Sequence, residues 1–249
     1  MKNKVCGLII SYDNYLHLAE INFLSIRKYW PDLNYDLYYL SNERKFSKNY
    51  EFIKNINVGT DVSWSLSLKK ALINLSKNYD YVLTFIDDLI LTSEVNNNLF
   101  ELILDSFIKS GGNHIKLHNP KPNKPYNKFF GELTSKMPYR ATTVFTIWKI
   151  DFLIEILLDN ENAWDFEKNA KDRIKNSEGI FSAHDKLFKF ENTVVKGKYQ
   201  WIFNKIIKDL DFDKTLLPTI QYFTLYDYLK RFYLKIRNKT YMTIIRKIK

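Results

Sequence analysis

A run of apolar residues that ends in two adjacent carboxylates constrains this chain more than any other feature. Residues 79–91 read YDYVLTFIDDLIL, so that the apolar stretch 81–86 runs directly into Asp87 and Asp88. Burying an unpaired carboxylate costs several kcal/mol, so this pair predicts a cation, hydrogen-bond donors or a ligand at the end of a core strand. In open α/β sheets, ligands bind at the carboxyl ends of the strands. The alternative is an ordinary strand-to-turn junction, in which Asp serves as a turn residue or helix cap.

The first third of the chain alternates between strand and helix patterns. Apolar runs predict strands at 5–12, 35–40, 52–58 and 81–86, and apolar residues at helical spacing predict helices at 16–30 and 64–75. Strands that alternate with helices favour a mainly parallel sheet with right-handed crossovers. We therefore expect an α/β fold with helices on the faces of the sheet.

The second half is less regular and gives weaker boundaries. Its patterns predict helices near 99–107 and 152–158, short strands at 114–118 and 142–148, and a turn at 161–167 that opens another helix. The segment 119–138 holds four prolines, which predicts a long loop over the sheet and no core element. With no linker before about Leu210, we expect one domain over 1–210 and a helical basic extension over 211–249.

Composition narrows the compartment and the partners. Cys6 is the single cysteine among 249 residues, which excludes an intrachain disulfide and is typical of the cytoplasm. No apolar run approaches the ~18 residues of a spanning helix, and the first apolar run is too short for a signal peptide. The net charge of +10 indicates an anionic partner, either nucleic acid, a phosphorylated small molecule or an acidic membrane. A general enrichment in Lys, Asn and Ile is the alternative explanation of this charge.

The order of these features resembles that of a known enzyme family. The β–α units, the strand that ends in Asp87-Asp88, a Thr-rich strand followed by Trp148, the acidic segment 161–167 and the sequence VVKGK at 194–198 are similar to the GT-A glycosyltransferases of bacterial capsule, O-antigen and lipooligosaccharide assembly. The resemblance covers roughly residues 4 to 205. It implies transfer of a sugar from a nucleotide-diphosphate donor to a saccharide or lipid-linked saccharide acceptor. It also implies a divalent cation held by an Asp-x-Asp motif, which is contracted here to Asp87-Asp88.

Roles for the carboxylate pair follow from the chemistry of the leaving group. Carboxylate oxygens suit Mg²⁺ or Mn²⁺, which stabilise the charge that develops on a departing diphosphate. We assign Asp88 as a metal ligand and Asp87 as a support for the ribose or the metal. His184 is a candidate for a further ligand or a diphosphate contact, although a lone His is more often structural.

Other residues are candidates for binding the donor. Residues 11–13 follow the first strand, where the family's nucleotide base lies, although an ordinary turn would look the same. The glycine of the Lys-Gly-Lys sequence would let the backbone approach a phosphate, although a solvated basic turn fits equally well. Trp64 precedes the acidic strand and is more typical of the core. The donor-binding candidates are therefore Ser11, Tyr12, Asp13, Trp64, Asp87, Lys196 and Lys198.

An inverting transfer, which we slightly favour, needs a general base for the acceptor hydroxyl. A carboxylate at the start of a helix that faces the donor would serve, and in the family the acidic segment usually supplies it. Asp165, Glu167 and Glu161 are our candidates, in that order. The alternative is that Asn162 and Asp165 form only a helix cap.

The C-terminal tail has a character of its own. Apolar residues from Leu225 to Ile236 recur at helical spacing between lysines and arginines, and the chain has no acidic residue after Asp227. This pattern predicts a basic interfacial helix that would bring a cytoplasmic enzyme to the inner face of the membrane. The alternative is a helix that packs its apolar face on the domain.

Two other functions remain open on the sequence. A sugar nucleotidyltransferase or another nucleotide-handling α/β enzyme would share this fold, but the chain lacks a Gly-rich phosphate loop after the first strand. A non-catalytic nucleic-acid-binding protein would explain the charge but has no need of the carboxylate pair, and no nucleic-acid motif is recognisable. Nucleic acid is therefore the disfavoured partner.

Overall fold

The computed structural model describes residues 4–46, 52–118, 122–135, 137, 140–230 and 233. The chain divides into two compact units, an N-terminal unit of residues 1–191 and a C-terminal unit of residues 192–249. The division comes before the boundary near Leu210 that the sequence led us to expect. The assignment of the longer segment 1–210 as a catalytic domain stays a prediction.

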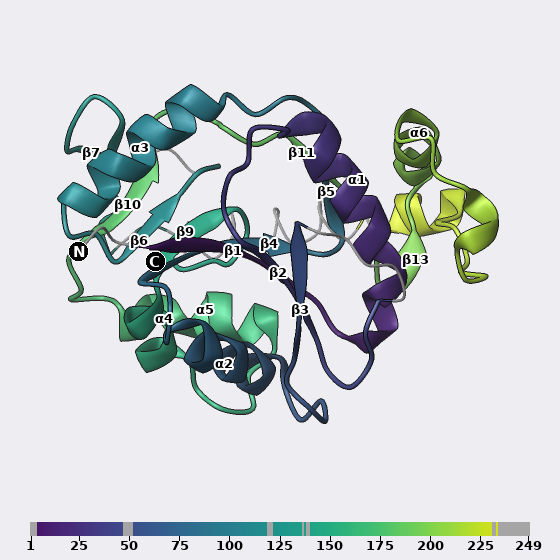
Figure 1. Ribbon diagram of the computed structural model, residues 1–249, viewed down its shortest axis with the longest axis horizontal. Helices are drawn as coiled ribbons and strands as arrows, with labels where there is room; N and C mark the ends of the chain where they lie inside the picture. Colours follow the sequence, from purple (N-terminus) through teal and green to yellow (C-terminus); the bar gives the residue numbers. More distant parts are fainter. Residues whose placement is uncertain are drawn as a thin grey trace. The chain divides into compact units, whose positions relative to one another are not determined.

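A central sheet organises the N-terminal unit (Figure 1). In the described residues nine strands pair in the order β3-β2-β1-β4-β9-β6-β10-β8-β7. Only β9 and β8 run against the other seven, so the sheet is mostly parallel. The strands are β1 (Val5–Ile10), β2 (Leu37–Ser41), β3 (Ile53–Asn57), β4 (Tyr81–Ile86), β6 (His114–Lys116), β7 (Lys124–Pro125), β8 (Phe130–Glu132), β9 (Thr146–Lys149) and β10 (Ile180–Ala183). Two further strands, β5 (Leu89–Leu91) and β11 (Phe190–Asn192), pair separately.

Helices cover both faces of this sheet. One face carries the 3-10 helix η1 (Asp13–Leu18), α1 (Ala19–Tyr29) and α3 (Asn97–Lys109), and the other carries α2 (Trp64–Leu75), α4 (Ile150–Ile156) and α5 (Ala163–Arg173), as Figure 1 shows for the α-helices. Ser63 caps α2 by accepting a hydrogen bond from Leu66 N. The predicted α/β class, with a mainly parallel sheet flanked by helices, is confirmed.

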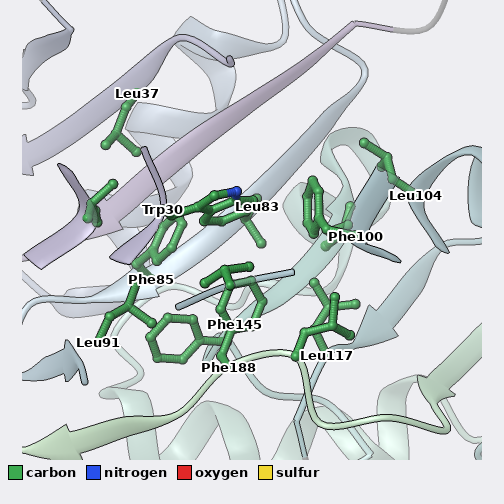
Figure 2. Packing of buried hydrophobic residues seen from close by; sticks show 14 of the residues in the cluster. Trp30, Leu37, Leu83, Phe85, Leu91, Phe100, Leu104, Leu117, Phe145 and Phe188 are labelled. Atoms are coloured by element: carbon green, nitrogen blue, oxygen red, sulfur yellow. The ribbon is translucent and has the colours of Figure 1, made fainter. Parts of the chain in front are cut away.

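Alternation along the strands creates two separate cores. On β4, Leu83 and Phe85 point into the core under α1 and α3, whereas Val82 points into the core under α2, α4 and α5. The first core is rich in aromatic rings (Figure 2), and the centroids of Trp30 and Phe100 lie 4.7 Å apart. Edge-to-face packing of this kind stabilises beyond the area that the rings bury.

The expectation that residues 119–138 contain no core element is wrong for part of that segment. Residues of β8 pair with β10 in the sheet, and Phe130 is fully buried. The proline argument fails because β7 and β8 form the edge of the sheet. There Pro125, which has no N–H to donate, is tolerated.

The C-terminal unit contains a β-hairpin, a helix and a short helical segment. The hairpin joins β12 (Val194–Val195) to β13 (Lys198–Tyr199), α6 (Trp201–Asp209) follows it, and a 3-10 helix η2 (Lys214–Leu216) comes next. Residues 225–230 and 233 are helical, whereas the rest of the predicted tail helix lies outside the described residues. Among the described residues, no helix combines the length and the apolar character needed to cross a membrane.

Candidate active site at the carboxyl edge of the sheet

The carboxylate pair lies where the direction of the strand order changes. In the sheet, β1 and β4 are neighbours. The chain leaves β1 toward β2 on one side of this pair, and it leaves β4 toward β6 on the other side. This is the topological switch point at which open α/β sheets form a crevice for ligands. Ile10 and Ile86 are partners in the parallel register, which places Ser11 beside Asp87 at the carboxyl edge.

Asp87 is held from two sides. Ser11 Oγ donates to Asp87 Oδ2 over 2.5 Å, and Tyr39 OH in turn donates to Ser11 Oγ over 2.8 Å. The Asn22 amide donates to the backbone carbonyl of Asp87. Asp87 is buried, and burial, together with the neighbouring charge of Asp88, raises its pKa well above the usual value. A bound cation would reverse this shift, so the site favours a positive ligand.

Asp88 lies next to it and is only partly covered. Burial raises the pKa of Asp88 to about 6, against the opposing effect of a hydrogen bond from its own backbone N–H. One or two carboxylates completed by phosphate oxygens and water are the ligand set that Mg²⁺ prefers. Asp88, supported by Asp87, therefore fits a divalent cation.

His184 is engaged elsewhere. Its Nε2 lies 3.0 Å from the Asn127 carbonyl oxygen, and its backbone N–H donates to the Phe129 carbonyl. In the described part of the chain, no three His, Cys, Asp or Glu side chains gather in a way that could hold a metal ion. The three-residue set of Asp87, Asp88 and His184 expected from the sequence is therefore not assembled, and the carboxylate pair is the part that remains.

A small pocket opens beside the end of β1. It has a volume of about 260 Å³ and is lined by Tyr12, Asp13, Asn14, Asn42, Glu43, Thr60 and Asp61. Asp13 Oδ1 accepts from Asn42 N, and Asp13 Oδ2 accepts from Glu43 N and from the next residue, at 2.8 to 3.1 Å. Asp13 thus fixes the segment after β2 that forms one wall, and Tyr12 also lines the pocket. The role of Asp13 is therefore to shape the pocket.

The remaining donor-binding candidates have structural roles. The ring centroid of Trp64 lies 5.6 Å from that of Phe166, and the partly buried Trp64 packs against the core under α2, α4 and α5. Lys196 (φ 51°) and Gly197 (φ 72°) are the two residues that turn the hairpin between β12 and β13. Positive φ at both positions is what a type I′ turn requires. Lys198 forms an ion pair with Asp227 over 2.9 Å. A phosphate contact by either lysine stays a prediction.

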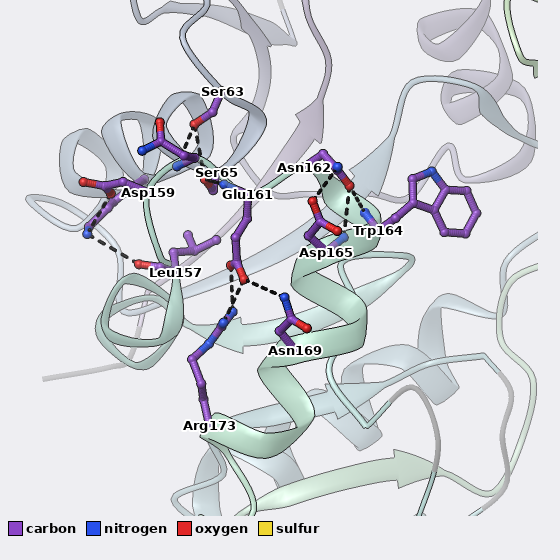
Figure 3. Close-up of polar contacts among 12 residues, drawn as sticks. Ser63, Ser65, Leu157, Asp159, Glu161, Asn162, Trp164, Asp165, Asn169 and Arg173 are labelled. Carbon is purple, nitrogen blue, oxygen red and sulfur yellow. Dashed lines mark hydrogen bonds and ion pairs between the residues drawn. The ribbon is translucent and has the colours of Figure 1, made fainter.

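Two of the three candidate bases support α5 itself. Figure 3 shows that Glu161 binds Arg173 through both oxygens, each at 2.8 Å. Burial acts to raise the pKa of Glu161, but hydrogen bonds from Arg173 and Asn169 outweigh it and hold the pKa below its usual value. Asp165 accepts from the Asn162 amide over 2.6 Å, and Asn162 caps the helix. Asp165 thus contacts the residue that caps the start of α5, and Glu161 is paired with Arg173, the last residue of the helix.

Glu167 lies in a different environment, on the side of α5 that faces the sheet. It accepts a hydrogen bond from the hydroxyl of Thr142. Burial raises the pKa of Glu167, against the opposing effects of the Thr142 hydroxyl and the positive charge of Lys116. A carboxylate with a raised pKa and an adjustable hydroxyl partner has the properties of a general base. The assignment of a general base among the three candidates stays a prediction.

A row of buried polar residues crosses the sheet below Glu167. Thr84, Thr146, Lys116 and Ser182 are successive register partners on β4, β9, β6 and β10. All four are buried, and the hydroxyls of Thr84 and Thr146 lie 2.9 Å apart. Because Thr84 comes three residues before Asp87, the row lies roughly 10 Å along the strand from the carboxylate pair.

Several of these residues could not be identified from sequence reasoning. Asn22 and Tyr39 look like ordinary members of a helix and a strand, yet they hold Asp87 and Ser11. The sequence does contain a signal for Lys116, because a lysine in the middle of a short apolar segment between two histidines is unusual.

The larger cavity lies away from this site. It measures about 540 Å³ and is lined by Asn113 and Gly179, which immediately precede β6 and β10, and by Arg140 from the segment between β8 and β9. The Arg140 guanidinium donates to three backbone carbonyls, those of Leu133, Ile174 and Ser177. Because the amino ends of parallel strands lie opposite to their carboxyl ends, this cavity opens at the other edge of the sheet.

No protein-family profile matches the chain, and no curated protein sequence does either. Among solved structures, the chain is similar to a protein from Desulfovibrio desulfuricans G20 described as a "putative nucleotide-diphospho-sugar transferase", with a TM-score of 0.43 and 10% sequence identity over 70% of this chain and 76% of that one. At this level of similarity the function has to be argued from the site itself.

Proposed function

We propose that this chain is a glycosyltransferase that moves a sugar from a nucleotide-diphosphate donor to the hydroxyl of an acceptor. The observation that carries the proposal is the pair of carboxylates at the switch point of the sheet. Asp87 is buried and held by Ser11, while Asp88 remains partly open at the edge. Phosphate-bearing ligands bind in this crevice of α/β folds, and adjacent carboxylates need a cation to approach a diphosphate.

The residues divide between the two ends of the donor. Tyr12 and the segment braced by Asp13 provide a pocket for the base and ribose at the end of β1. Asp88, supported by Asp87, would hold Mn²⁺ or Mg²⁺ against the diphosphate. When bound, the cation would stabilise the negative charge on the leaving nucleoside diphosphate.

Glu167 supplies the proton acceptor in this proposal. The bond from the anomeric carbon to the donor phosphate oxygen breaks, and a bond from that carbon to the acceptor oxygen forms. The proton of the acceptor hydroxyl passes to the Glu167 carboxylate. This assignment gives an inverting course, and Thr142 keeps the carboxylate in position meanwhile.

The acceptor and the cellular role are narrower parts of the proposal. A saccharide or lipid-linked saccharide as acceptor, a role in bacterial surface glycan assembly, and action at the cytoplasmic side of the membrane all come from the sequence resemblance. They predict that activity requires a glycan acceptor and not water alone.

Nucleotide binding provides the direct test. We expect nucleoside diphosphates to raise the thermal stability of the protein when Mn²⁺ is present, by about 2.7 kcal/mol in free energy at ~100 times the dissociation constant. The Asp88→Asn variant should lose the metal-dependent part of this effect and lower turnover by roughly a hundredfold or more.

An exposed carboxylate provides the matched control. Asp105→Asn removes the same charge from the solvent side of α3, where Asp105 forms an exposed ion pair with Lys109. This variant should behave like the wild type in both assays. Full metal-dependent binding by Asp88→Asn, or equal losses in the two variants, would contradict the assignment of the site.

A further inference from the structure

The net charge of this protein is concentrated in one of its two units. Residues 192–249 contain thirteen Lys and Arg but only four Asp and no Glu, a net charge of +9. Residues 1–191 contain the other 25 basic and 24 acidic residues and are close to neutral. General enrichment in lysine cannot explain such a division, because it would raise the charge of both units.

The C-terminal unit has a small core of its own. Among the residues of this unit that the structure describes, seven apolar ones are buried, namely Val194, Tyr199, Phe203, Ile206, Ile207, Leu210 and Phe223. The rings of Tyr199 and Phe203 stack at 4.4 Å, and the backbone of Tyr199 bonds to Gln221 and Phe223. The ion pair between Lys198 and Asp227 ties the hairpin to the helical segment 225–230. The outward-facing side chains of this unit therefore belong to a folded surface.

That surface also carries large apolar side chains. Trp201 is 54% exposed, Leu225 is 64% exposed and Tyr226 is 69% exposed, and Leu216, Leu229 and Tyr233 are exposed as well. Residues 225, 226, 229 and 233 follow the spacing of one helix face. The Trp201 ring lies 5.0 Å from that of Tyr228, so the start of α6 and this helical segment lie together. Exposed lysines at 205, 208, 214 and 230 accompany them.

We infer that the C-terminal unit is a docking surface for an anionic lipid membrane. Trp201, Tyr226 and Tyr233 enter the headgroup region, Leu225 and Leu229 reach the acyl boundary, and the lysines bind anionic headgroups. Trp and Tyr prefer this depth because their rings are apolar at one end and polar at the other. This inference does not depend on the proposed enzymatic activity.

The exposed leucines favour a membrane over a nucleic acid as the binding partner of this unit. Both partners favour cations and aromatic rings, because bases stack on aromatic side chains. Leucine neither stacks on bases nor binds phosphate, and its exposure to water has no purpose at a nucleic-acid surface. It gains free energy in the acyl boundary of a bilayer, at about 0.8 kcal/mol for each buried CH₂.

Vesicle sedimentation tests the electrostatic part with the full-length protein. We expect binding to vesicles of phosphatidylcholine mixed with phosphatidylglycerol, weaker binding to phosphatidylcholine alone, and weaker but measurable binding at high salt, where only the apolar contacts remain. The triple variant Lys205→Gln, Lys208→Gln and Lys214→Gln should weaken binding roughly a hundredfold, since each cation near the surface contributes about 1 kcal/mol.

A matched variant removes the same charge from the other unit. Lys77→Gln, Lys168→Gln and Lys171→Gln replace three exposed lysines of the N-terminal unit and should leave vesicle binding unchanged. If the two triple variants lose binding equally, the effect comes from the net charge of the chain, and the assignment of the C-terminal unit is overturned.

The apolar part is tested by a pair of serine substitutions. Leu225→Ser with Leu229→Ser should reduce binding at least tenfold, including at salt concentrations that already screen the lysines. Ile73→Ser with Leu102→Ser, at comparably exposed positions of α2 and α3, should not. All these positions are at the surface, and thermal unfolding verifies that the variants fold. Unchanged vesicle binding by the Leu225/Leu229 variant, or binding to single-stranded RNA that is tighter than binding to anionic vesicles, would overturn the inference.

Discussion

The hydroxyl of Ser11 lies 2.5 Å from a carboxylate oxygen of Asp87, although 76 positions separate the two residues in the chain. Parallel pairing of β1 with β4 creates this contact, since it brings the carboxyl ends of both strands to the same level. Tyr39 on β2 extends the chain of hydrogen bonds by donating to Ser11. Three adjacent strands thus hold one buried carboxylate in place.

Removal of the Ser11 hydroxyl should cost stability as well as ligand binding. We expect Ser11→Ala to lower the free energy of unfolding by about 1 to 3 kcal/mol, because a buried carboxyl group loses its side-chain donor. Tyr39→Phe should cost about 1 kcal/mol. Urea unfolding of both single variants and the double variant measures the coupling between them. Strict additivity of the two effects would contradict a shared network.

Asp13 offers a test of how the nucleotide pocket is shaped. In Asp13→Asn the remaining carbonyl oxygen can still accept from Asn42 N, but Glu43 N and the following N–H lose their shared acceptor. We expect a loss of about 1 to 2 kcal/mol in stability and weaker binding of nucleoside diphosphates, measured by calorimetry. If stability falls but nucleotide affinity stays at the wild-type value, the pocket beside β1 is not the nucleotide site.

Local patterns were sufficient for much of the fold. The strand predicted at 81–86 has these bounds in the structure, and the helix predicted at 64–75 spans the same residues as α2. Both have strong apolar periodicity and clear ends. The segment 119–138 was harder, because proline excludes a central strand but permits an edge strand, and only the tertiary neighbours determine which of the two applies.

The candidate site could be predicted only in part, for a related reason. Position along the chain revealed that Asp87 and Asp88 end a core strand, which is local information. The helix-start pattern favours Asp165 over Glu167 as the base, because Asp165 lies nearer the start of the helix. The surroundings of Glu167 depend on tertiary contacts that this pattern does not reveal, because Thr142 and Lys116 lie 25 and 51 positions away.

The three carboxylates of the acidic segment should separate by phenotype. Glu167→Gln should lower turnover by about 10² to 10⁴-fold while leaving nucleoside diphosphate binding intact, because a general base acts on the acceptor. Glu161→Gln should instead cost about 1 to 3 kcal/mol of stability, since Arg173 loses its charged partner. Steady-state kinetics and urea unfolding of the same preparations distinguish these effects.

Asp165→Asn provides the control within the same segment. It removes a partly exposed charge beside the Asn162 cap and should change stability by less than about 1 kcal/mol, with wild-type turnover. If Asp165→Asn lowers turnover more than Glu167→Gln does, the base is at the helix start and the burial argument is wrong.

Lys116 should make the protein more stable as the pH rises above about 8. Burial lowers the pKa of Lys116 to about 8 from 10.5, with the charge of Glu167 acting in the opposite direction. Between pH 8 and pH 10.5 the unfolded chain binds more protons than the native protein, so the contribution of this lysine to the free energy of unfolding increases as the pH rises.

Below pH 8 Lys116 is charged in the native protein, and burial of this charge lowers the free energy of unfolding. Lys116→Met should therefore stabilise the protein at pH 7 by up to about 3 kcal/mol. The advantage should shrink as the pH rises from 8 to 10.5, whereas Lys77→Met at an exposed position should show no such trend. Urea unfolding at a series of pH values measures both variants against the wild type. A Lys116→Met protein that is less stable than the wild type at pH 7 would show that Glu167 compensates the buried ammonium fully.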